Sequence, residues 1–141
     1  MFDRMLVFAI AIAYAVMLLI LVASGDFRFI RAILVPAITF GIVSYIRVRI
    51  DAPRPYDLYD IDPIIVKNTQ GLSFPSRHVA SAFIIAFALA WVHLDWGVLG
   101  FIACGVVAFT RIVGGVHFPK DVVAAIAISA VCGLIGFVLI P

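Results

Sequence analysis

The chain has 141 residues, of which 65% are hydrophobic and 13% are charged, and its mean hydropathy is +1.22. Soluble globular domains are about 45–50% apolar and about 25% charged, so this composition excludes an ordinary soluble fold and indicates an integral membrane protein. The formal net charge of +2 by itself decides little about partners, and no nucleic-acid partner is expected.

Five apolar runs follow one another along the chain. A helix needs about 20 apolar residues to cross a hydrocarbon core of about 30 Å, and in lipid the segment must be helical because no water satisfies its backbone. The predicted spans are Met5–Ala23, Ile30–Ile46, Val79–Val92, Val98–Ile112 and Val122–Ile140. We therefore predict an all-α fold, an integral-membrane helical bundle with about five transmembrane helices in one domain over residues 1–141.

The first run ends in the small residues of "VASG", Val22 to Gly25, which resemble a signal-peptidase site. Its apolar core is longer than that of a typical signal peptide and only one arginine precedes it, so we predict a span that is retained. With five spans of alternating direction, the amino terminus is then expected on the same side of the membrane as the loop after the second run.

A long polar segment, residues 47–76, separates the second and third runs. It contains four prolines, the acidic series of "DAPRPYDLYDID" and the turn-forming "KNTQG", which together cannot continue a helix. A loop of this length is uncommon in a compact protein and is often functional. The two cysteines, Cys104 and Cys132, fall inside apolar runs and are predicted to be small core residues rather than a disulfide or zinc ligands.

Ionisable residues gather on one face of the bundle if the spans alternate in direction. Seven of the ten basic residues then lie at that face, together with two histidines and an aspartate: Arg47, Arg49, Arg54, Lys67, Arg77, Arg111, Lys120, His78, His117 and Asp121. Charged groups at membrane depth are costly, so such a cluster predicts a functional site. The alternative is that basic side chains reach the headgroups and anchor the helices, which is the favoured interpretation for Arg49, Lys67 and Lys120.

The third run is introduced by "SFPSRHVASAF", Ser73 to Phe83, in which Pro75 and Ser76 favour a helix start. Unpaired N–H groups at a helix start form an anion site, to which Arg77 and the Ser76 hydroxyl add donors suited to phosphate oxygens. His78 lies at the edge of this anion site, where a histidine can protonate a leaving oxygen near neutral pH. A capping serine followed by an interfacial Arg-His pair explains the stretch nearly as well.

The fourth and fifth runs are joined by "TRIVGGVHFPKD", Thr110 to Asp121. The spacing from i to i+4 predicts His117 and Asp121 on the same face of the last helix, within reach of a hydrogen bond. The carboxylate can then hold one ring nitrogen and leave the other as a nucleophile. A local capping pair of histidine and aspartate at a helix start is the alternative interpretation.

These three segments together resemble the signature motifs of the type 2 phosphatidic acid phosphatase family, which shares its site architecture with the vanadium haloperoxidases. "RVRIDAPRP" resembles the first motif, a lysine, six residues and then Arg-Pro, with Arg47 in place of the lysine. "PSRH" resembles Pro-Ser-Gly-His, with Arg77 in place of the glycine. The third segment matches the family's motif at Arg111, His117 and Asp121, with a threonine in place of its first serine.

The resemblance implies a membrane lipid phosphatase that needs no cofactor or metal. His117 would attack phosphorus to form a phosphohistidine with support from Asp121, and His78 would protonate the leaving group and then activate water. The implied phosphate-binding residues are Arg47, Arg54, Ser76, Arg77 and Arg111. Many family members have six spans where this sequence predicts five, which suggests a homodimer as the source of the missing packing surface.

The substrate is expected to be a lipid, because the ionisable cluster lies where helix ends meet headgroups. A polyprenyl diphosphate is favoured, with phosphatidic acid and phosphatidylglycerol phosphate as alternatives. The absence of glutamate from the sequence and its small size favour a prokaryotic plasma (inner) membrane. The resemblance favours an active site that faces outward, whereas a raw count of basic residues favours the cytoplasmic side.

Three other classes of protein are alternatives. The cluster could belong to a non-catalytic anion-binding protein or transporter subunit, to a metal-dependent hydrolase with His78, His117 and Asp121 as ligands, or to a haloperoxidase. Five arginines near the cluster disfavour a metal cation, and a haloperoxidase is expected on a larger soluble scaffold. His93, in "WVHLDW" at the other end of the third run, is predicted to be an interfacial residue without a role in the chemistry.

Overall fold

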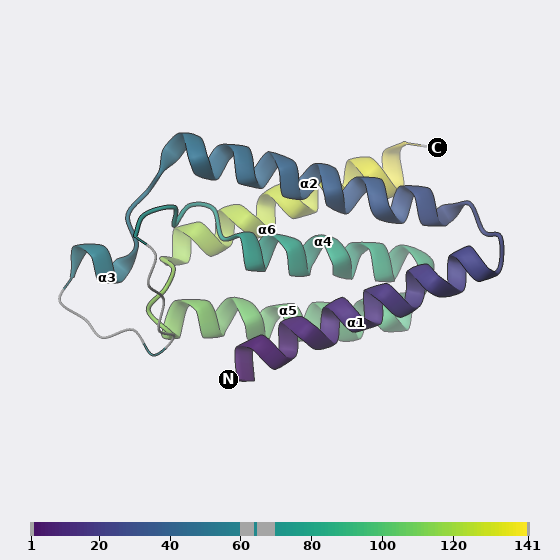
Figure 1. Ribbon diagram of the computed structural model, residues 1–141, viewed down its shortest axis with the longest axis horizontal. Helices are drawn as coiled ribbons and strands as arrows, with labels where there is room; N and C mark the ends of the chain where they lie inside the picture. The colour runs from purple at the N-terminus through teal and green to yellow at the C-terminus, as the bar shows by residue number, and fades with distance from the viewer. Residues whose placement is uncertain (1, 60–63, 65–69, 141) are drawn as a thin grey trace.

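The computed structural model describes residues 2–59, 64 and 70–140, and within this part of the chain it contains helices and no strands. The helices are α1 (Phe2–Ala23), α2 (Arg28–Ile50), α3 (Pro55–Leu58), α4 (Arg77–Val92), α5 (Leu94–Val113), α6 (Pro119–Gly133) and the π-helix η1 (Leu134–Leu139). The long helices run up and down along the long axis of the molecule, with α1, α4 and α6 in one direction and α2 and α5 in the other (Figure 1). The predicted all-α helical bundle is therefore confirmed.

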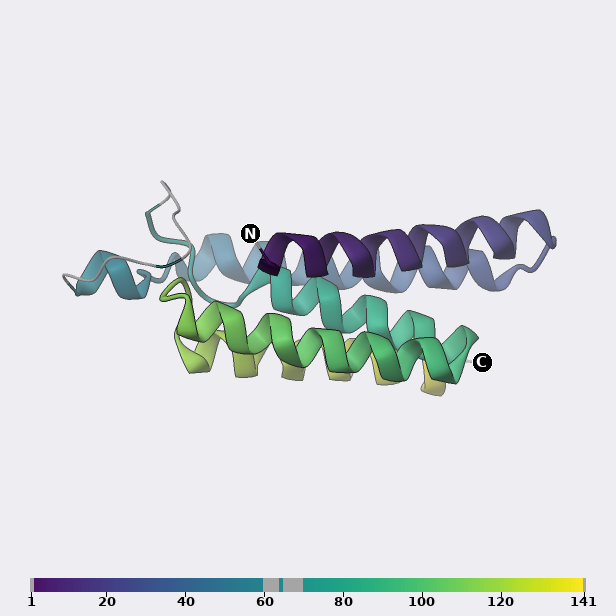
Figure 2. The same cartoon turned by 90° about the horizontal axis from the view of Figure 1, so that it is seen from below.

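Helix α4 occupies the centre of the bundle. It contacts α1, α2, α5 and α6, and Figure 2 shows it between one layer formed by α1 and α2 and another formed by α5 and α6. Its buried residues include several alanines, and such small side chains allow neighbouring helices to approach closely. On the α5 side, a Cβ atom added to Gly97 would overlap Ala90, so glycine is required where these two helices touch.

The five predicted spans correspond to α1, α2, α4, α5 and the continuous pair of α6 and η1. Four segments are long and apolar enough to cross a membrane: Met5–Ala23, Arg28–Leu58, Leu94–Val113 and Pro119–Leu139. The fifth, α4, has 16 residues, which is about 24 Å of helix and shorter than a hydrocarbon core. Because the other helices surround α4, it contacts protein over most of its length, and the chain as a whole is an integral membrane protein.

Two predicted helix boundaries differ from the structure. The second predicted span ends at Ile46, whereas α2 continues to Ile50, because arginine is a good helix former and the Arg47 side chain is buried in the protein rather than solvated. Asp51 then ends the helix with a left-handed backbone, at φ 41°. The last helix begins at Pro119, three residues before the apolar run, since proline is favourable at the first position of a helix.

The polar loop after α2 contains the short helix α3, which the sequence did not predict. Acidic side chains organise this loop through backbone groups. The Asp57 carboxylate accepts hydrogen bonds from the N–H groups of Arg54 and Gly71, each at 2.9 Å, and Asp51 accepts one from Leu72 at 3.1 Å. The segment that precedes α4 is thereby held against the segment that follows α2.

Candidate active site

The predicted site residues lie at one end of the bundle, where α2 and α5 end and where α4 and α6 begin (Figure 1). The backbone N–H of Ser76 donates to the backbone carbonyl of Asp121 over 3.1 Å, which joins the starts of α4 and α6. Arg47 Nη1 donates to the carbonyl of Pro75 over 3.2 Å, which joins the end of α2 to the start of α4. Residues from the three sequence motifs are thus neighbours in space.

Three arginine side chains are almost fully buried in this region, with exposed fractions of 6% for Arg47, 1% for Arg54 and 3% for Arg111. The Arg54 guanidinium is fixed by hydrogen bonds to the carbonyls of Gly71 at 2.9 Å and Val116 at 3.3 Å. Buried cations are normally paired with carboxylates, yet Asp121 is the one buried carboxylate among the described residues. Counted over the described residues, the region therefore holds an excess of positive charge, which suits an anion with several oxygens such as phosphate.

Several buried polar atoms here have no hydrogen-bond partner within the described part of the chain. They include Arg47 Nε, Ser76 Oγ and His117 Nε2. Buried polar groups are normally hydrogen-bonded, so polar atoms left without a partner around a positively charged centre are suited to a ligand. Ser76 occupies the N-cap position of α4 as predicted, but its hydroxyl makes no capping hydrogen bond. Its side chain is therefore not used to hold the helix start.

His117 and Asp121 form a buried pair, with His117 Nδ1 at 3.5 Å from Asp121 Oδ2. The sequence predicted this pair from helical spacing, but that reason is wrong, because His117 precedes the first helical residue, Pro119. The contact arises where the chain turns into α6. The backbone N–H of Phe118 donates to Asp121 Oδ2 at 3.0 Å, and this bond holds the carboxylate against the residues that precede α6.

Ser73 is a member of this cluster that the sequence analysis did not single out. Its side chain is fully buried, and its hydroxyl lies 2.5 Å from Asp121 Oδ2 and 3.3 Å from His117 Nδ1. The one signal available in the sequence is its place in the same short stretch as Ser76 and His78. A serine next to a helix start is ordinarily explained by capping or by turn formation, so the residue type alone does not predict this contact.

The environment of His117 favours the neutral imidazole. Burial lowers the pKa of His117 below its ordinary value of 6.5, and the positive charges of Arg54 and Arg47 act in the same direction. The hydrogen bond and the charge of Asp121 oppose this shift without cancelling it. A neutral ring near pH 7 keeps a lone pair on one nitrogen, as a nucleophile requires.

A groove of about 390 Å³ lies between α1, α2 and α4 beside this cluster. Most of its lining is apolar: Val7, Ile10, Ala11, Phe40, Ala82 and Ile85. Arg77 and His78, in the first turn of α4, also line it, and the Arg77 guanidinium carbon is 5.9 Å from the centroid of the Phe40 ring. Arg77 is exposed at the groove, unlike the three buried arginines, and His78 is half-buried.

The remaining basic residues of that face have surface positions. Arg49 is exposed and lies over the ring of Tyr45, and Lys120 is exposed and lies over the ring of Phe118. These contacts agree with anchoring side chains rather than with ligands of a buried anion. Lys67 lies outside the described residues.

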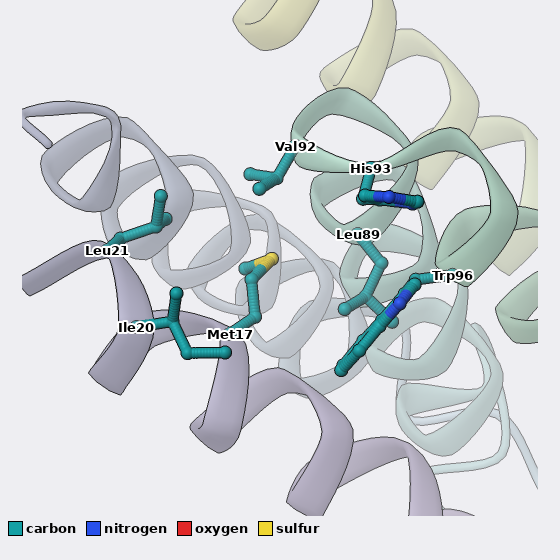
Figure 3. A pocket seen from close by; sticks show the side chains of 7 residues that line it. All are labelled: Met17, Ile20, Leu21, Leu89, Val92, His93 and Trp96. Atoms are coloured by element: carbon teal, nitrogen blue, oxygen red, sulfur yellow. The ribbon is translucent and has the colours of Figure 1, made fainter. Parts of the chain in front are cut away.

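His93 lies at the opposite end of the bundle, at the single-residue junction of α4 and α5. It borders a second apolar groove, in which Met17 of α1 faces Leu89 of α4 and Trp96 of α5 (Figure 3). Its side chain is exposed, and its ring is 3.9 Å from Asp95. His93 is thus separated from the buried cluster by the length of α4.

Among the residues that the structure describes, no three histidine, cysteine, aspartate or glutamate side chains are grouped so that they could hold a metal ion. The metal-hydrolase hypothesis requires such a group from His78, His117 and Asp121. The donor set around His117 consists instead of guanidinium groups, hydroxyl groups and one carboxylate, which is suited to an anion.

Comparisons with known proteins agree with this arrangement. The family model of the PAP2 superfamily matches residues 6–141. The chain is 27% identical over 138 residues to the undecaprenyl-diphosphatase BcrC of Bacillus subtilis, a match that covers 89% of this chain and 67% of that protein. It is 41% identical over 61 residues to the lipid A 1-phosphatase of Rhizobium johnstonii, covering 41% of this chain and 24% of that protein.

A solved structure gives a similar result over a larger share of both chains. The crystal structure of Aquifex aeolicus LpxE superposes with a TM-score of 0.79 at 27% sequence identity, and the match covers 96% of this chain and 82% of that one. The similarity therefore extends over nearly the whole chain.

Proposed function

The chain belongs to the PAP2 superfamily, and from that premise we propose that it is a membrane lipid phosphatase that hydrolyses a terminal phosphate through a phosphohistidine. The observation that carries this proposal is the buried His117, whose Nε2 has no partner within the described residues, in a region with three buried arginines. A neutral imidazole among cations is the combination that an attack on a phosphate ester requires.

The reaction has two steps in this proposal. His117 Nε2 forms a bond to phosphorus while the bond from phosphorus to the leaving oxygen breaks, and His78 donates the proton that this oxygen needs. Water then attacks the phosphohistidine, His78 accepts a proton from it, and the P–N bond breaks to release phosphate. The second step returns both histidines to their starting protonation states, so the cycle consumes one water molecule and no cofactor.

The buried arginines would stabilise the charge that develops on the phosphoryl oxygens. They are already desolvated, and Arg47 and Arg54 are held by backbone carbonyls, so little reorganisation accompanies the reaction. Removing one such donor typically costs on the order of 3 kcal/mol in the barrier, or about a hundredfold in rate. The Ser76 hydroxyl and the N–H groups at the start of α4 would supply further hydrogen bonds.

The groove between α1, α2 and α4 supports a lipid substrate. One end carries Arg77 and His78, and the rest is apolar, so a phosphorylated headgroup and a hydrocarbon chain each find a matching surface. In this arrangement the chain of the lipid lies along α1 and Phe40 while its phosphate reaches the buried arginines. Arg77, exposed at the groove, would contact the part of the headgroup that remains outside.

A polyprenyl diphosphate is the substrate that we propose first. The relative that supports it, an undecaprenyl-diphosphatase, matches across most of this chain. A glycolipid phosphate is the second candidate, because the lipid A 1-phosphatase has the higher identity, although over a shorter segment. Arg77, which replaces the glycine of the family's second motif, adds a cation at the groove that could hold the second phosphate of a diphosphate.

The test is phosphate release by the purified protein from undecaprenyl diphosphate, lipid A, phosphatidic acid and phosphatidylglycerol phosphate. We expect hydrolysis of at least one of them, highest for the diphosphate, with inhibition by orthovanadate and no loss of activity in a chelator. Failure of the wild-type protein on all four lipids would overturn the proposed function. Hydrolysis that requires added magnesium would contradict the mechanism.

We also propose a bacterial inner membrane and an active site that faces outward. Gln70 is exposed near the site and Asp95 is exposed at the other end, so the two positions form a matched pair for cysteine labelling. In intact cells, a membrane-impermeant maleimide should label Gln70→Cys, whereas Asp95→Cys should react after permeabilisation only. The reverse pattern would place the active site in the cytoplasm.

A further inference from the structure

Ser73 is held rigidly in the loop before α4. Its backbone N–H donates to the carbonyl of Ala52 at 2.8 Å, and its side chain has an exposed fraction of 0%. The loop segment around Ala52 is the one that follows α2, so the position of Ser73 depends on how the ends of α2 and α4 are joined. A buried hydroxyl is normally hydrogen-bonded, because leaving it without a partner costs free energy.

The Ser73 hydroxyl lies closer to both members of the His117–Asp121 pair than they lie to each other. Its oxygen is 2.5 Å from Asp121 Oδ2 and 3.3 Å from His117 Nδ1, whereas the direct distance from Nδ1 to Oδ2 is 3.5 Å. Hydrogen bonds from N–H to oxygen are usually 2.7–3.2 Å long, so both contacts of Nδ1 are longer than usual, and the one to the serine oxygen is the shorter of the two. The serine oxygen is the better placed acceptor for a proton on Nδ1.

The direction of these hydrogen bonds follows from what each group can donate. An ionised carboxylate only accepts, and Asp121 Oδ2 already accepts the N–H of Phe118, which favours the ionised form. Ser73 therefore donates its one proton to Asp121, and its lone pairs remain for His117. Because the serine proton is committed, Nδ1 must carry the hydrogen that it shares with Ser73, and the lone pair of the neutral ring lies on Nε2.

We propose that Ser73 is a positioning residue that connects the Asp121 carboxylate to the His117 ring. Its hydroxyl fixes the tautomer with the proton on Nδ1, and Nε2 is thereby kept as the nucleophile. When Nε2 bonds to phosphorus the ring becomes positively charged, and Nδ1–H donates more strongly to the serine oxygen, which in turn is polarised by the carboxylate. The catalytic part of this inference rests on the proposed phosphatase function, while the tautomer does not depend on it.

The experiment compares Ser73→Ala, which removes the hydroxyl, with Ser73→Thr, which keeps it. Ser129→Ala is the matched control, because Ser129 is a buried serine of α6 that hydrogen-bonds to the carbonyls of Ala80 and Ala125. Each variant is purified in detergent, and its melting temperature and elution volume are compared with those of the wild-type protein. Two readouts then follow, the tautomer of His117 by ¹⁵N NMR without substrate and steady-state phosphate release.

We expect the wild-type protein and Ser73→Thr to show one His117 tautomer, with the proton on Nδ1, and Ser73→Ala to show a mixture. The kcat of Ser73→Ala should fall by roughly 10–100-fold, the loss typical when a group that orients a reactive side chain is removed, with KM nearly unchanged. Ser73→Thr should restore most of the kcat, and Ser129→Ala should keep it even if its melting temperature falls.

A folded Ser73→Ala protein that retains the single tautomer, or whose kcat stays within about twofold of wild type, would overturn the role of Ser73. So would a Ser73→Thr variant that is folded but as impaired as Ser73→Ala. A wild-type protein that releases no phosphate from any lipid would overturn the proposed function instead. The NMR readout separates the two cases, because it reports the Ser73 contact in the free protein.

Discussion

The backbone N–H of Ser76 donates a hydrogen bond of 3.1 Å to the backbone carbonyl of Asp121, so helices α4 and α6 begin side by side. His78 follows Ser76 in the first turn of α4, and His117 precedes the first residue of α6. The two histidines therefore lie at the same end of the bundle, and the arginines at the end of α2 and the end of α5 complete the region.

Replacing His117 should abolish turnover, because no other buried imidazole is present among the described residues. We expect His117→Ala to release no phosphate and to form no phosphoenzyme when it is mixed with radiolabelled substrate and quenched in alkali. His93→Ala is the control, since His93 is exposed at the other end of α4 and should leave kcat nearly unchanged. A labelled phosphoenzyme in His117→Ala would identify another nucleophile.

Arg47 should be required for its charge at a buried position. Arg47→Met should lower kcat/KM by about a hundredfold, equal to about 2.7 kcal/mol, because it removes a desolvated cation from the phosphate region. Arg47→Lys should keep substantial activity, since it retains the charge and corresponds to the lysine of the family's first motif. Arg49→Met, two residues along α2 and exposed, should change kcat/KM by less than about twofold. Equal losses in Arg47→Met and Arg49→Met would contradict a specific role for the buried arginine.

The acid limb of the pH profile should lie below pH 6.5. A protonated His117 has no lone pair on Nε2, so kcat/KM falls as the pH drops through the pKa of His117 in the free enzyme, and burial lowers that pKa from its ordinary value of 6.5. Asp121 raises the pKa of His117, so Asp121→Asn should move the acid limb to still lower pH while also reducing kcat. An acid limb above pH 6.5, or an upward shift in Asp121→Asn, would contradict the assignment of this limb to His117.

A bulky side chain in the groove should impair activity on lipid substrates and leave activity on soluble substrates unchanged. Ala11 of α1 lines the groove that contains Arg77 and His78, so Ala11→Trp should raise the KM for a long-chain lipid by roughly tenfold, or about 1.4 kcal/mol of binding. The rate with a short, water-soluble phosphate ester should stay the same. Ala9→Trp is the matched control, because Ala9 lines a separate groove on the α5 side of α1. An equal effect of both tryptophans on the lipid KM would assign the loss to helix packing rather than to substrate binding.

Close contact between α4 and α5 should make Gly97 sensitive to a single methyl group. A Cβ atom at Gly97 would overlap Ala90, so Gly97→Ala should destabilise the protein by about 1–3 kcal/mol, measured as a lower melting temperature in detergent. Gly105, also in α5, has no atom within 4 Å of the corresponding position, and Gly105→Ala should be neutral or slightly stabilising because alanine favours helix. Similar melting temperatures for the two variants would show that α5 can move away from α4.

The sequence predicted the fold class, the five helical segments and the end of the bundle at which the motifs meet. The order of the motifs also indicated the family, and the comparisons confirm it. Its errors were local: α2 extends past Ile46 into the charged residues, the loop contains α3, and His117 precedes α6 instead of belonging to it. The end of α2 was assigned by hydropathy, the loop by its prolines and turn residues, and the place of His117 by its spacing from Asp121. A helix instead begins and ends where its backbone hydrogen bonds do.

The sequence by itself determined membrane insertion, the number of long helices and the grouping of charges at one end. Hydropathy and the alternating direction of successive spans can be followed from consecutive residues. Tertiary structure alone decided that Arg54 is buried and Arg77 exposed, and that Ser73 contacts both His117 and Asp121. Those contacts join segments that are distant in the chain, and a hydroxyl or guanidinium group takes its role from the atoms that the folded loops bring within hydrogen-bond distance.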